Sequence, residues 1–297
     1  MITTRRIPVG TPDDGPYALA VDAAGDVWAT LVYSGRLVRV RGDGGGVAET
    51  VDLGAPESRP SRMAVTADGS LWCTRTGDHR VERLLPCSDP AGAGRSRHSV
   101  VVDGAGPYDV TVGPDGAVWF TAIAAESVGR IDPDTEEVSL FPLPRPGMPA
   151  MITTGPDGAL WCTLNSAGAL ARVAVGGAVS VHELPDPGCG PVGITARPDG
   201  LWFVEILAGR AGRLDPAGGV VEFDLPDRDG KPHAVVATDD GCLLTLWGGS
   251  ALVGLAPDGS ATPHDVLAPG DHPHGLLVRG GEVWVALDSG DLAVLSI

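Results

Sequence analysis

Residues 106–121 read GPYDVTVGPDGAVWFT, and this stretch returns in altered form six more times along the chain. The other copies are GPYALAVDAAGDVWAT from residue 15, RPSRMAVTADGSLWCT from 59, MPAMITTGPDGALWCT from 148, GPVGITARPDGLWFVE from 190, KPHAVVATDDGCLLTL from 231 and HPHGLLVRGGEVWVAL from 272. Successive prolines lie 41–47 residues apart, and a tryptophan follows each proline by 11 or 12 residues, except that the sixth copy has Leu243 there. A fixed period of this length indicates a repeat architecture.

Each copy can be divided into short β-strands. An alternating run follows the proline, a turn such as PDG comes next, and a second run surrounds the tryptophan. Two further runs complete the copy, for example SVGRI at 127–131 and VSVHELP at 179–185. Glycine in the turn supplies the positive φ that a tight hairpin requires. Four short strands per period with almost no helical periodicity predict an all-β fold, a seven-bladed β-propeller with four antiparallel strands per blade.

The two ends of the sequence complement each other. TTRRIPVG at 3–10 resembles an outer strand with no blade before it, and DLAVLSI at 291–297 resembles a third strand with no fourth after it. We predict that the N-terminal strand completes the C-terminal blade and closes the ring, which leaves no exposed sheet edge there. Residues 1–297 are expected to form a single propeller domain.

Composition limits the classes of partner. The formal net charge is −17, which disfavours nucleic acids and anionic membranes because both would be repelled. No run of about 18 apolar residues suggests a transmembrane helix, and MITTRRIPVG does not resemble a secretory signal. The five cysteines are scattered without a C-x-x-C motif, as is typical of buried thiols in a reducing compartment. We therefore expect a cytoplasmic, monomeric protein.

A candidate site follows from the repeat register. The first strand of each blade lines the central axis, so the residue after each proline should face the mouth of a central funnel. These residues are Tyr17, Ser61, Tyr108, Ala150, Val192, His233 and His274. Arg75, Glu205 and Asp288, which follow the tryptophans, should reach the same mouth because adjacent antiparallel strands end side by side.

Each of these residues also has a purely structural interpretation. The prolines are explained fully as strand-starting turns, Tyr17 and Tyr108 could be aromatic packing, and Glu205 could pair with a nearby arginine. Histidine, however, follows the proline only in the two adjacent copies six and seven. An imidazole can move a proton near neutral pH, and a nearby carboxylate can hold a divalent cation that stabilises an enolate. No nucleophile elbow, P-loop or dinucleotide fingerprint is present.

The ordered motifs resemble the virginiamycin B lyase (streptogramin B lyase) family over the whole chain: GPY in copies one and three, GPVGIT in five, KPHAV in six and HPHG in seven. The resemblance implies a carbon–oxygen lyase that opens cyclic peptide or depsipeptide antibiotics by elimination at an ester bond, and hence a role in antibiotic resistance. It implies that His274 is the catalytic proton-transfer residue and that His233 contacts the substrate. We assign Tyr17, Tyr108 and Glu205 to substrate binding as well.

The resemblance also implies Mg²⁺ held by two acidic residues of the seventh copy. Asp288 matches one of them, but His272 stands where the family has the other, with Asp271 one residue earlier. Mg²⁺ prefers oxygen ligands, whereas Zn²⁺, Mn²⁺ or Ni²⁺ accept nitrogen together with oxygen. Asp288 and His272 are therefore candidate ligands for Mg²⁺ or another divalent ion, and a metal-free site in which His272 and His274 act as acid and base is the alternative.

Two other functions compete with the lyase. A metal-dependent hydrolase or an isomerase of a peptide natural product would use the same scaffold, and loss of one acidic ligand favours such a departure. A non-catalytic propeller that only binds a ligand is the third possibility.

Overall fold

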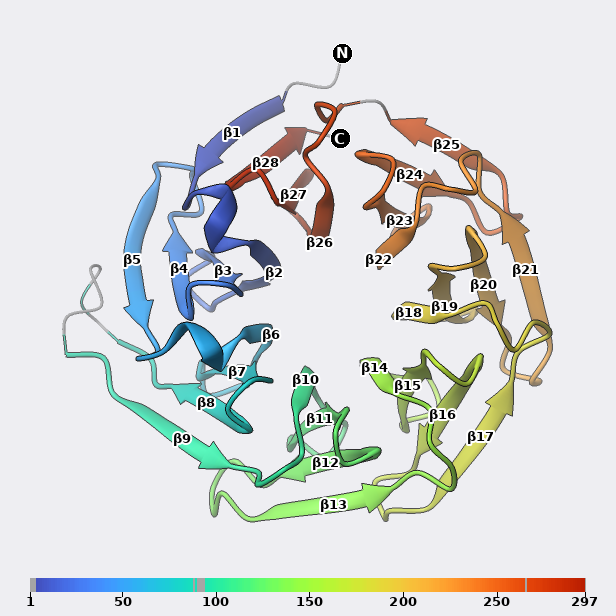
Figure 1. Ribbon diagram of the computed structural model, residues 1–297, viewed down its shortest axis with the longest axis horizontal. Helices are drawn as coiled ribbons and strands as arrows, with labels where there is room; N and C mark the ends of the chain where they lie inside the picture. Colours follow the sequence, from blue (N-terminus) through green and yellow to red (C-terminus); the bar gives the residue numbers. More distant parts are fainter. Residues whose placement is uncertain (1–3, 88, 90–93, 265, 297) are drawn as a thin grey trace.

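The computed structural model describes residues 4–87, 89, 94–264 and 266–296. Seven four-stranded antiparallel sheets stand around a common centre, each with its first strand innermost (Figure 1). The innermost strands of neighbouring sheets contact one another all the way round. The predicted all-β, seven-bladed propeller is thus confirmed, and we number its blades one to seven along the chain.

The strands fall into four concentric sets. The innermost strands are β2 (Pro16–Val21), β6 (Pro60–Val65), β10 (Pro107–Val112), β14 (Pro149–Thr154), β18 (Pro191–Arg197), β22 (Pro232–Thr238) and β26 (Pro273–Arg279). The second strands are β3 (Val27–Leu31), β7 (Leu71–Arg75), β11 (Val118–Ala122), β15 (Leu160–Leu164), β19 (Gly200–Glu205), β23 (Gly241–Leu246) and β27 (Glu282–Leu287).

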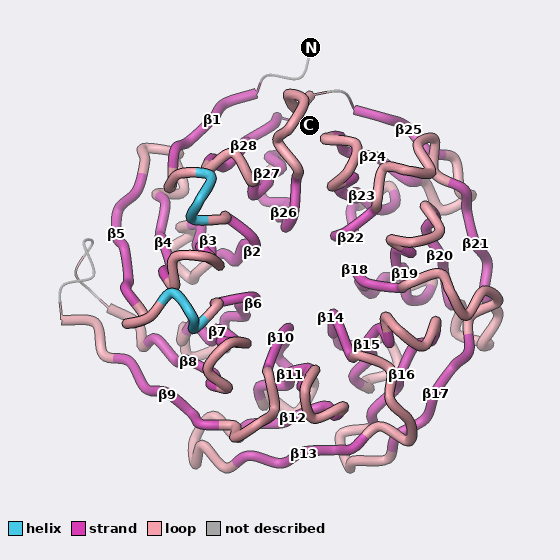
Figure 2. Tube along the Cα trace, viewed as in Figure 1, coloured by secondary structure: helices cyan, strands magenta, loops and turns pink. Residues whose placement is uncertain are grey.

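The third strands are β4 (Arg36–Val40), β8 (Arg80–Leu84), β12 (Ser127–Ile131), β16 (Ala169–Val173), β20 (Arg210–Leu214), β24 (Ala251–Leu255) and β28 (Asp291–Ser296). The outer strands are β5 (Val47–Asp52), β9 (Arg97–Val101), β13 (Val138–Pro142), β17 (Val179–Glu183), β21 (Val220–Asp224), β25 (Ala261–His264) and β1 (Thr4–Pro8). Two short 3₁₀ helices, η1 (Pro12–Asp14) and η2 (Pro56–Ser58), precede blades one and two (Figure 2). Neither described helix has the length or the apolarity that a bilayer span requires.

The ring closes as predicted. β1 pairs antiparallel with β28, so blade seven has the strand order β1-β28-β27-β26 (Figure 1). Ile7 of β1 is 3% exposed and packs in one hydrophobic cluster with Trp284 of blade seven and Val38 of blade one. Arg6 donates hydrogen bonds to both carboxylate oxygens of Asp271, which precedes β26. The closing strand is therefore fixed by pairing, apolar burial and a partly buried ion pair.

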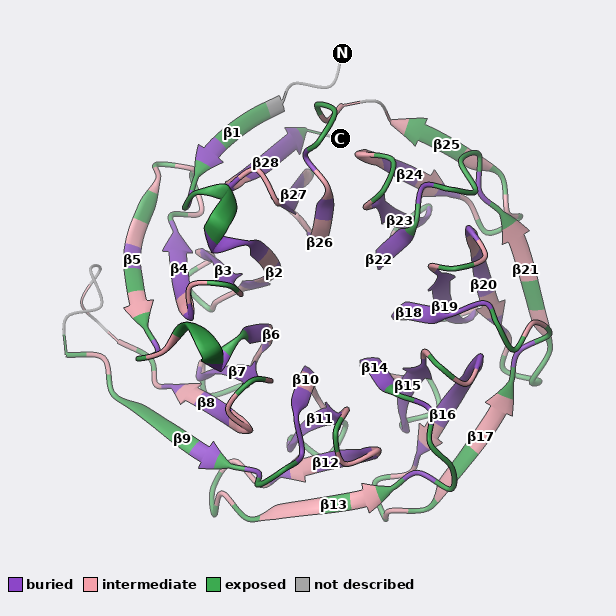
Figure 3. Ribbon diagram, in the orientation of Figure 1, coloured by how far each residue is buried: buried purple, intermediate pink, exposed green. Residues whose placement is uncertain are grey.

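The repeated tryptophans form the blade cores. Trp28, Trp72, Trp119, Trp161, Trp202 and Trp284 are all buried, and burial is concentrated in the inner three strands while the outer strands face solvent (Figure 3). The aspartate of the PDG turn explains why that turn recurs: Asp115 accepts hydrogen bonds from the Trp119 indole and from Arg130. Asp157 does the same for Trp161 and Arg172. The buried indole N–H groups of Trp119 and Trp161 are thereby satisfied, as burial requires.

A β-bulge at the start of each innermost strand shapes the centre of the ring. In blade three the register shifts between Pro107 and Val110, so Tyr108 and Asp109 leave the regular ladder. Thr121, two residues past the tryptophan, replaces the lost ladder bonds: its hydroxyl accepts from Asp109 N and donates to Ala150 O of the next blade. Bulges re-aim side chains, and here they turn the residues after the prolines toward the axis.

Candidate active site

Four of the seven residues that follow the prolines come together at the centre. The ring centroid of Tyr17 lies 4.8 Å from that of His274, 5.5 Å from that of His233 and 6.5 Å from that of Tyr108. The two histidine rings are 5.1 Å apart. We call these four residues, from blades one, three, six and seven, the tyrosine–histidine cluster. The predicted meeting of Tyr17, Tyr108, His233 and His274 is what the structure shows.

Hydrogen bonds tie the cluster together. The Tyr17 hydroxyl bonds to the Tyr108 hydroxyl and lies 3.1 Å from His233 Nε2. Burial raises the pKa of both phenols, so both tyrosines are neutral and can donate hydrogen bonds. Burial, followed by the charges of His274 and Arg62, lowers the pKa of His233 well below its usual value, so this imidazole is neutral as well.

His274 and Asp288 form a pair. His274 Nε2 lies 2.9 Å from Asp288 Oδ1, and the Trp247 indole donates to Asp288 Oδ2 at 3.4 Å. Burial alone would raise the pKa of Asp288, but the hydrogen bond and charge of His274, together with the Trp247 bond, hold it below its usual value. Asp288 is therefore a carboxylate that orients His274, and with Nε2 donating to it the other ring nitrogen is the free base. His274 Nδ1 is buried and has no hydrogen-bond partner.

The backbone of His274 is held from the neighbouring blade. The Thr245 hydroxyl accepts from Ala234 N in its own blade and donates to His274 O at 2.9 Å. Thr74 likewise donates to Tyr108 O. Cluster residues from different blades are thereby fixed relative to one another by buried threonines.

His272 takes a structural position. Its φ is +44°, its Nδ1 bonds to Trp247 O at 3.0 Å, and its ring lies 5.5 Å from the Trp247 ring. Asp271 turns the other way, to Arg6. Both carboxylate oxygens of Asp288 already accept hydrogen bonds, and among the described residues no group of three or more His, Cys, Asp or Glu side chains could hold a metal ion. Asp288 and His272 together offer one carboxylate and one imidazole, whereas Mg²⁺ prefers oxygen ligands; the metal at these residues stays a prediction, and we derive no step through it.

Glu205 and Arg75 do not reach the funnel. Glu205 is fully buried inside blade five, where it pairs with Arg210 at 2.8 Å, and burial followed by the charge of Glu222 raises its pKa. Arg75 is buried inside blade two with Asp78 and Glu82. The expected placement was wrong because both residues still belong to the second strand, whose end is one strand removed from the axis. Asp288 stands one residue further past its tryptophan, beyond the end of β27, and that residue reaches the mouth.

Sequence reasoning missed three residues near the cluster. Trp247, which donates to Asp288, occupies in blade six the position that Asp288 occupies in blade seven, and this shared register was the available signal. Thr245 stands two positions past Leu243, at the position where copies one to four have the Thr of a W-x-T pattern. Arg62 is the second residue after Pro60, and its guanidinium carbon lies 5.6 Å from the Tyr17 ring.

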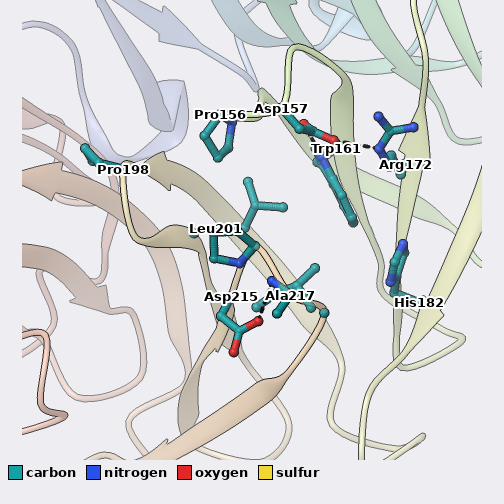
Figure 4. Close-up of a pocket in the computed structure, with 13 residues that line it drawn as sticks. Pro156, Asp157, Trp161, Arg172, His182, Pro198, Leu201, Asp215 and Ala217 are labelled. Atoms are coloured by element: carbon teal, nitrogen blue, oxygen red, sulfur yellow. Dashed lines mark hydrogen bonds and ion pairs between the residues drawn. The ribbon is translucent and has the colours of Figure 1, made fainter.

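A separate cavity of about 520 Å³ lies between blades four and five, away from the cluster (Figure 4). Trp161, His182, Leu201 and Leu214 line it, with the exposed Asp157–Arg172 pair at one end. In blades three and five a phenylalanine occupies the position of His182 and stacks on the tryptophan, as Phe141 does on Trp119 at 5.4 Å.

The turn of the following blade explains the gap. A Cβ on Gly177 would come within 2.6 Å of Phe141, and a Cβ on Gly259 within 2.0 Å of Phe223. At Gly218, the equivalent residue beside His182, nothing lies within 4 Å. The cavity is thus a place where the packing of one blade against the next is incomplete.

The His182 ring already lies 4.9 Å from that of Trp161, in a tilted arrangement. Replacing His182 by Phe should stabilise the protein by about 0.5 kcal/mol, the low end of the contribution of an aromatic pair, because the larger apolar ring would stack on Trp161 and fill more of the gap. Urea denaturation of the purified variant measures this. His98→Phe, at an exposed position of β9, is the matched control and should give no gain. A His182→Phe variant no more stable than the parent would show that the gap does not accept a ring.

Comparisons with known proteins find relatives of the same fold. Virginiamycin B lyase from Staphylococcus aureus superposes with a TM-score of 0.92 at 27% identity over 100% of both chains. The structure of a catalytically inactive histidine-to-alanine variant of that enzyme with Quinupristin superposes with a TM-score of 0.92 at 26% identity, again over 100% of both chains. A virginiamycin B lyase from Streptomyces coelicolor is 49% identical over 39 residues, which is 13% of each chain. The family model described as the virginiamycin B lyase family matches residues 2–295, and this chain therefore belongs to that family.

Proposed function

We propose that this protein is a lyase that opens a cyclic depsipeptide of the streptogramin B type by elimination at its ester linkage. The observation that carries the proposal is the pair of His274 and Asp288 beside the tyrosine–histidine cluster, with His274 Nδ1 free of any hydrogen-bond partner. A base oriented by a carboxylate is what proton abstraction from carbon requires. Membership of the family supports the choice of reaction.

The proposed step balances without water. His274 Nδ1 takes the proton from the carbon next to the one that bears the ester oxygen. The electrons of the broken C–H bond form a carbon–carbon double bond, and the C–O bond breaks with its electron pair on oxygen. The ester thus leaves as a carboxylate, the ring opens, and the product keeps the mass of the substrate. Asp288 stabilises the imidazolium that forms in between.

The rest of the cluster would position the substrate. The Tyr17 and Tyr108 phenols are neutral donors, and His233 Nδ1 is buried without a hydrogen-bond partner. Buried polar atoms without partners cost free energy that a bound substrate can recover by completing their hydrogen bonds. We assign carbonyl recognition on the substrate to these three side chains.

The reaction is tested by incubating purified protein with a streptogramin B depsipeptide in ¹⁸O-labelled water. Elimination predicts a linear product of unchanged mass with a new vinylic proton in its NMR spectrum. A product one water heavier and carrying the label would instead identify a hydrolase, and a still-cyclic epimer would identify an isomerase. Saturable binding with no product would identify a ligand-binding propeller.

A further inference from the structure

The side chain of Arg62 lies at the centre of the ring, in contact with two other blades. Arg62 starts from β6 in blade two, its Nη2 lies 2.6 Å from Met151 Sδ of blade four, and its guanidinium carbon lies 5.6 Å from the Tyr17 ring of blade one. The Tyr17 ring in turn lies 4.8 Å from the His274 ring. A group bound against Tyr17 is therefore within reach of both the base and the guanidinium.

The residues two positions after the prolines differ in size and charge between two sides of the ring. In blades five, six, seven and one they are small: Gly193, Ala234, Gly275 and Ala18. A Cβ on Gly193 would come within 2.6 Å of His233 O, and one on Gly275 within 2.6 Å of Tyr17 O, so the backbones leave no room there. In blades two, three and four the same position carries Arg62, Asp109 and Met151. The side of the ring opposite the two histidines thus carries long or charged side chains at this position.

The guanidinium of Arg62 has few acceptors around it. Of its five N–H donors, Nε is buried without a hydrogen-bond partner and Nη2 meets Met151 Sδ, a weak acceptor, while the side chain also hydrogen-bonds to Tyr108. The nearby Asp109 uses both carboxylate oxygens on the backbone N–H groups of Val110 and Ile152, each at 2.8 Å. Burial raises the pKa of Asp109 against the opposing charge of Arg62. Asp109 therefore balances the charge of Arg62 only in part, and the Nε–H of Arg62 stays without an acceptor.

The proposed elimination produces a carboxylate, which is an acceptor that the Arg62 guanidinium lacks. It turns a neutral ester into a carboxylate, so negative charge develops on the leaving oxygen in the transition state. A guanidinium binds a carboxylate with two parallel charge-assisted hydrogen bonds, and a pre-placed donor at a developing oxyanion accelerates reaction because it needs no reorganisation.

We propose that Arg62 binds the carboxylate that the elimination releases and is a catalytic residue of this protein. This inference rests on the proposed function. The electron pair of the broken C–O bond stays on the leaving oxygen, the abstracted proton stays on His274, and Arg62 remains charged throughout.

The experiment compares Arg62→Met and Arg62→Lys with the parent protein. Arg62→Met should lower kcat/KM by about 10²–10³, the usual effect of losing one oxyanion donor, and should weaken inhibition by the linear carboxylate product at least tenfold. Arg62→Lys keeps the charge but cannot form two parallel hydrogen bonds, so its kcat/KM should lie between those of the parent and Arg62→Met. Arg213→Met is the matched control because Arg213 Nε is also buried without a partner and its guanidinium also stacks on an aromatic ring, Trp202, far from the cluster; this variant should keep both values.

Two outcomes would overturn the inference without touching the proposed function. One is a folded Arg62→Met variant with parental kcat/KM, and the other is parental product inhibition in Arg62→Lys and Arg62→Met alike. If the parent protein gives no elimination product, the proposed function fails first. Calorimetric binding of the synthetic linear acid and of its primary amide then tests Arg62 alone, since equal affinity of the parent for both would refute a carboxylate site.

Discussion

Replacing His274 by Ala is expected to lower kcat/KM for ring opening by about 10²–10⁴ without unfolding the protein. The range is that of a general base removed from its position. His233, the other imidazole of the cluster, should not replace the lost base, because its Nε2 is hydrogen-bonded to Tyr17 and its ring lies 5.1 Å from that of His274. Loss of cyclic substrate, followed by chromatography at saturating and sub-saturating concentrations, measures the effect.

The matched control is His264→Ala. His264 lies in the outer strand β25, so its removal should leave kcat/KM unchanged. Asp288→Asn should cost less than His274→Ala, because the amide can still accept the hydrogen bond from His274 Nε2 but no longer stabilises the imidazolium. An active His274→Ala variant, or an Asp288→Asn variant more damaged than it, would remove His274 from the role of base.

Replacing Ile7 by Ala is expected to destabilise the protein by about 2–5 kcal/mol, the usual cost of truncating a buried isoleucine. Ile7 is 3% exposed and joins the cores of blades seven and one. The lost contacts hold β1 on β28, so the variant should also open at the ring closure before it unfolds globally. Urea denaturation gives the free energy, and hydrogen exchange of the β28 amides reports the local opening.

Val221→Ala is the matched control for Ile7. Val221 lies in the outer strand β21 of blade five and is 41% exposed, so its truncation should change stability by less than about 0.5 kcal/mol. If Ile7→Ala were as mild as Val221→Ala, or if β28 exchanged no faster than β20, β1 would not be the element that closes the ring.

The fold was predictable because its information is repeated seven times. The proline, the turn glycine and the tryptophan fix the register of each blade, and even the closing strand follows from the incomplete patterns at 3–10 and 291–297. The gathering of Tyr17, Tyr108, His233 and His274 followed from the same register. Periodicity therefore carried the prediction from the sequence to the centre of the ring.

The misplaced residues failed for a local reason. Whether a residue past the tryptophan faces the mouth or the blade interior depends on a single position in the strand, and Glu205 and Asp288 differ by that one position. The pairing of Asp288 with His274 and Trp247, and the pairing of Asp271 with Arg6, depend on side-chain rotamers that no repeat pattern encodes. The resemblance suggested a metal at Asp288 and His272, but which of their ligand atoms are free to bind one depends on rotamers that the sequence does not give.

The pairing of β1 with β28 also sets an order of events during synthesis. A ribosome makes β1 before the other strands of the ring and β28 after them, so β1 has no partner while six blades emerge and fold. The proposed base His274 and its partner Asp288 lie in the blade that β1 completes, and Arg6 of β1 reaches back to Asp271 just before His274. A translation product that stops before blade seven would therefore carry neither a closed ring nor the His274–Asp288 pair, and a nascent chain should gain the proposed activity in the same step in which β1 is captured.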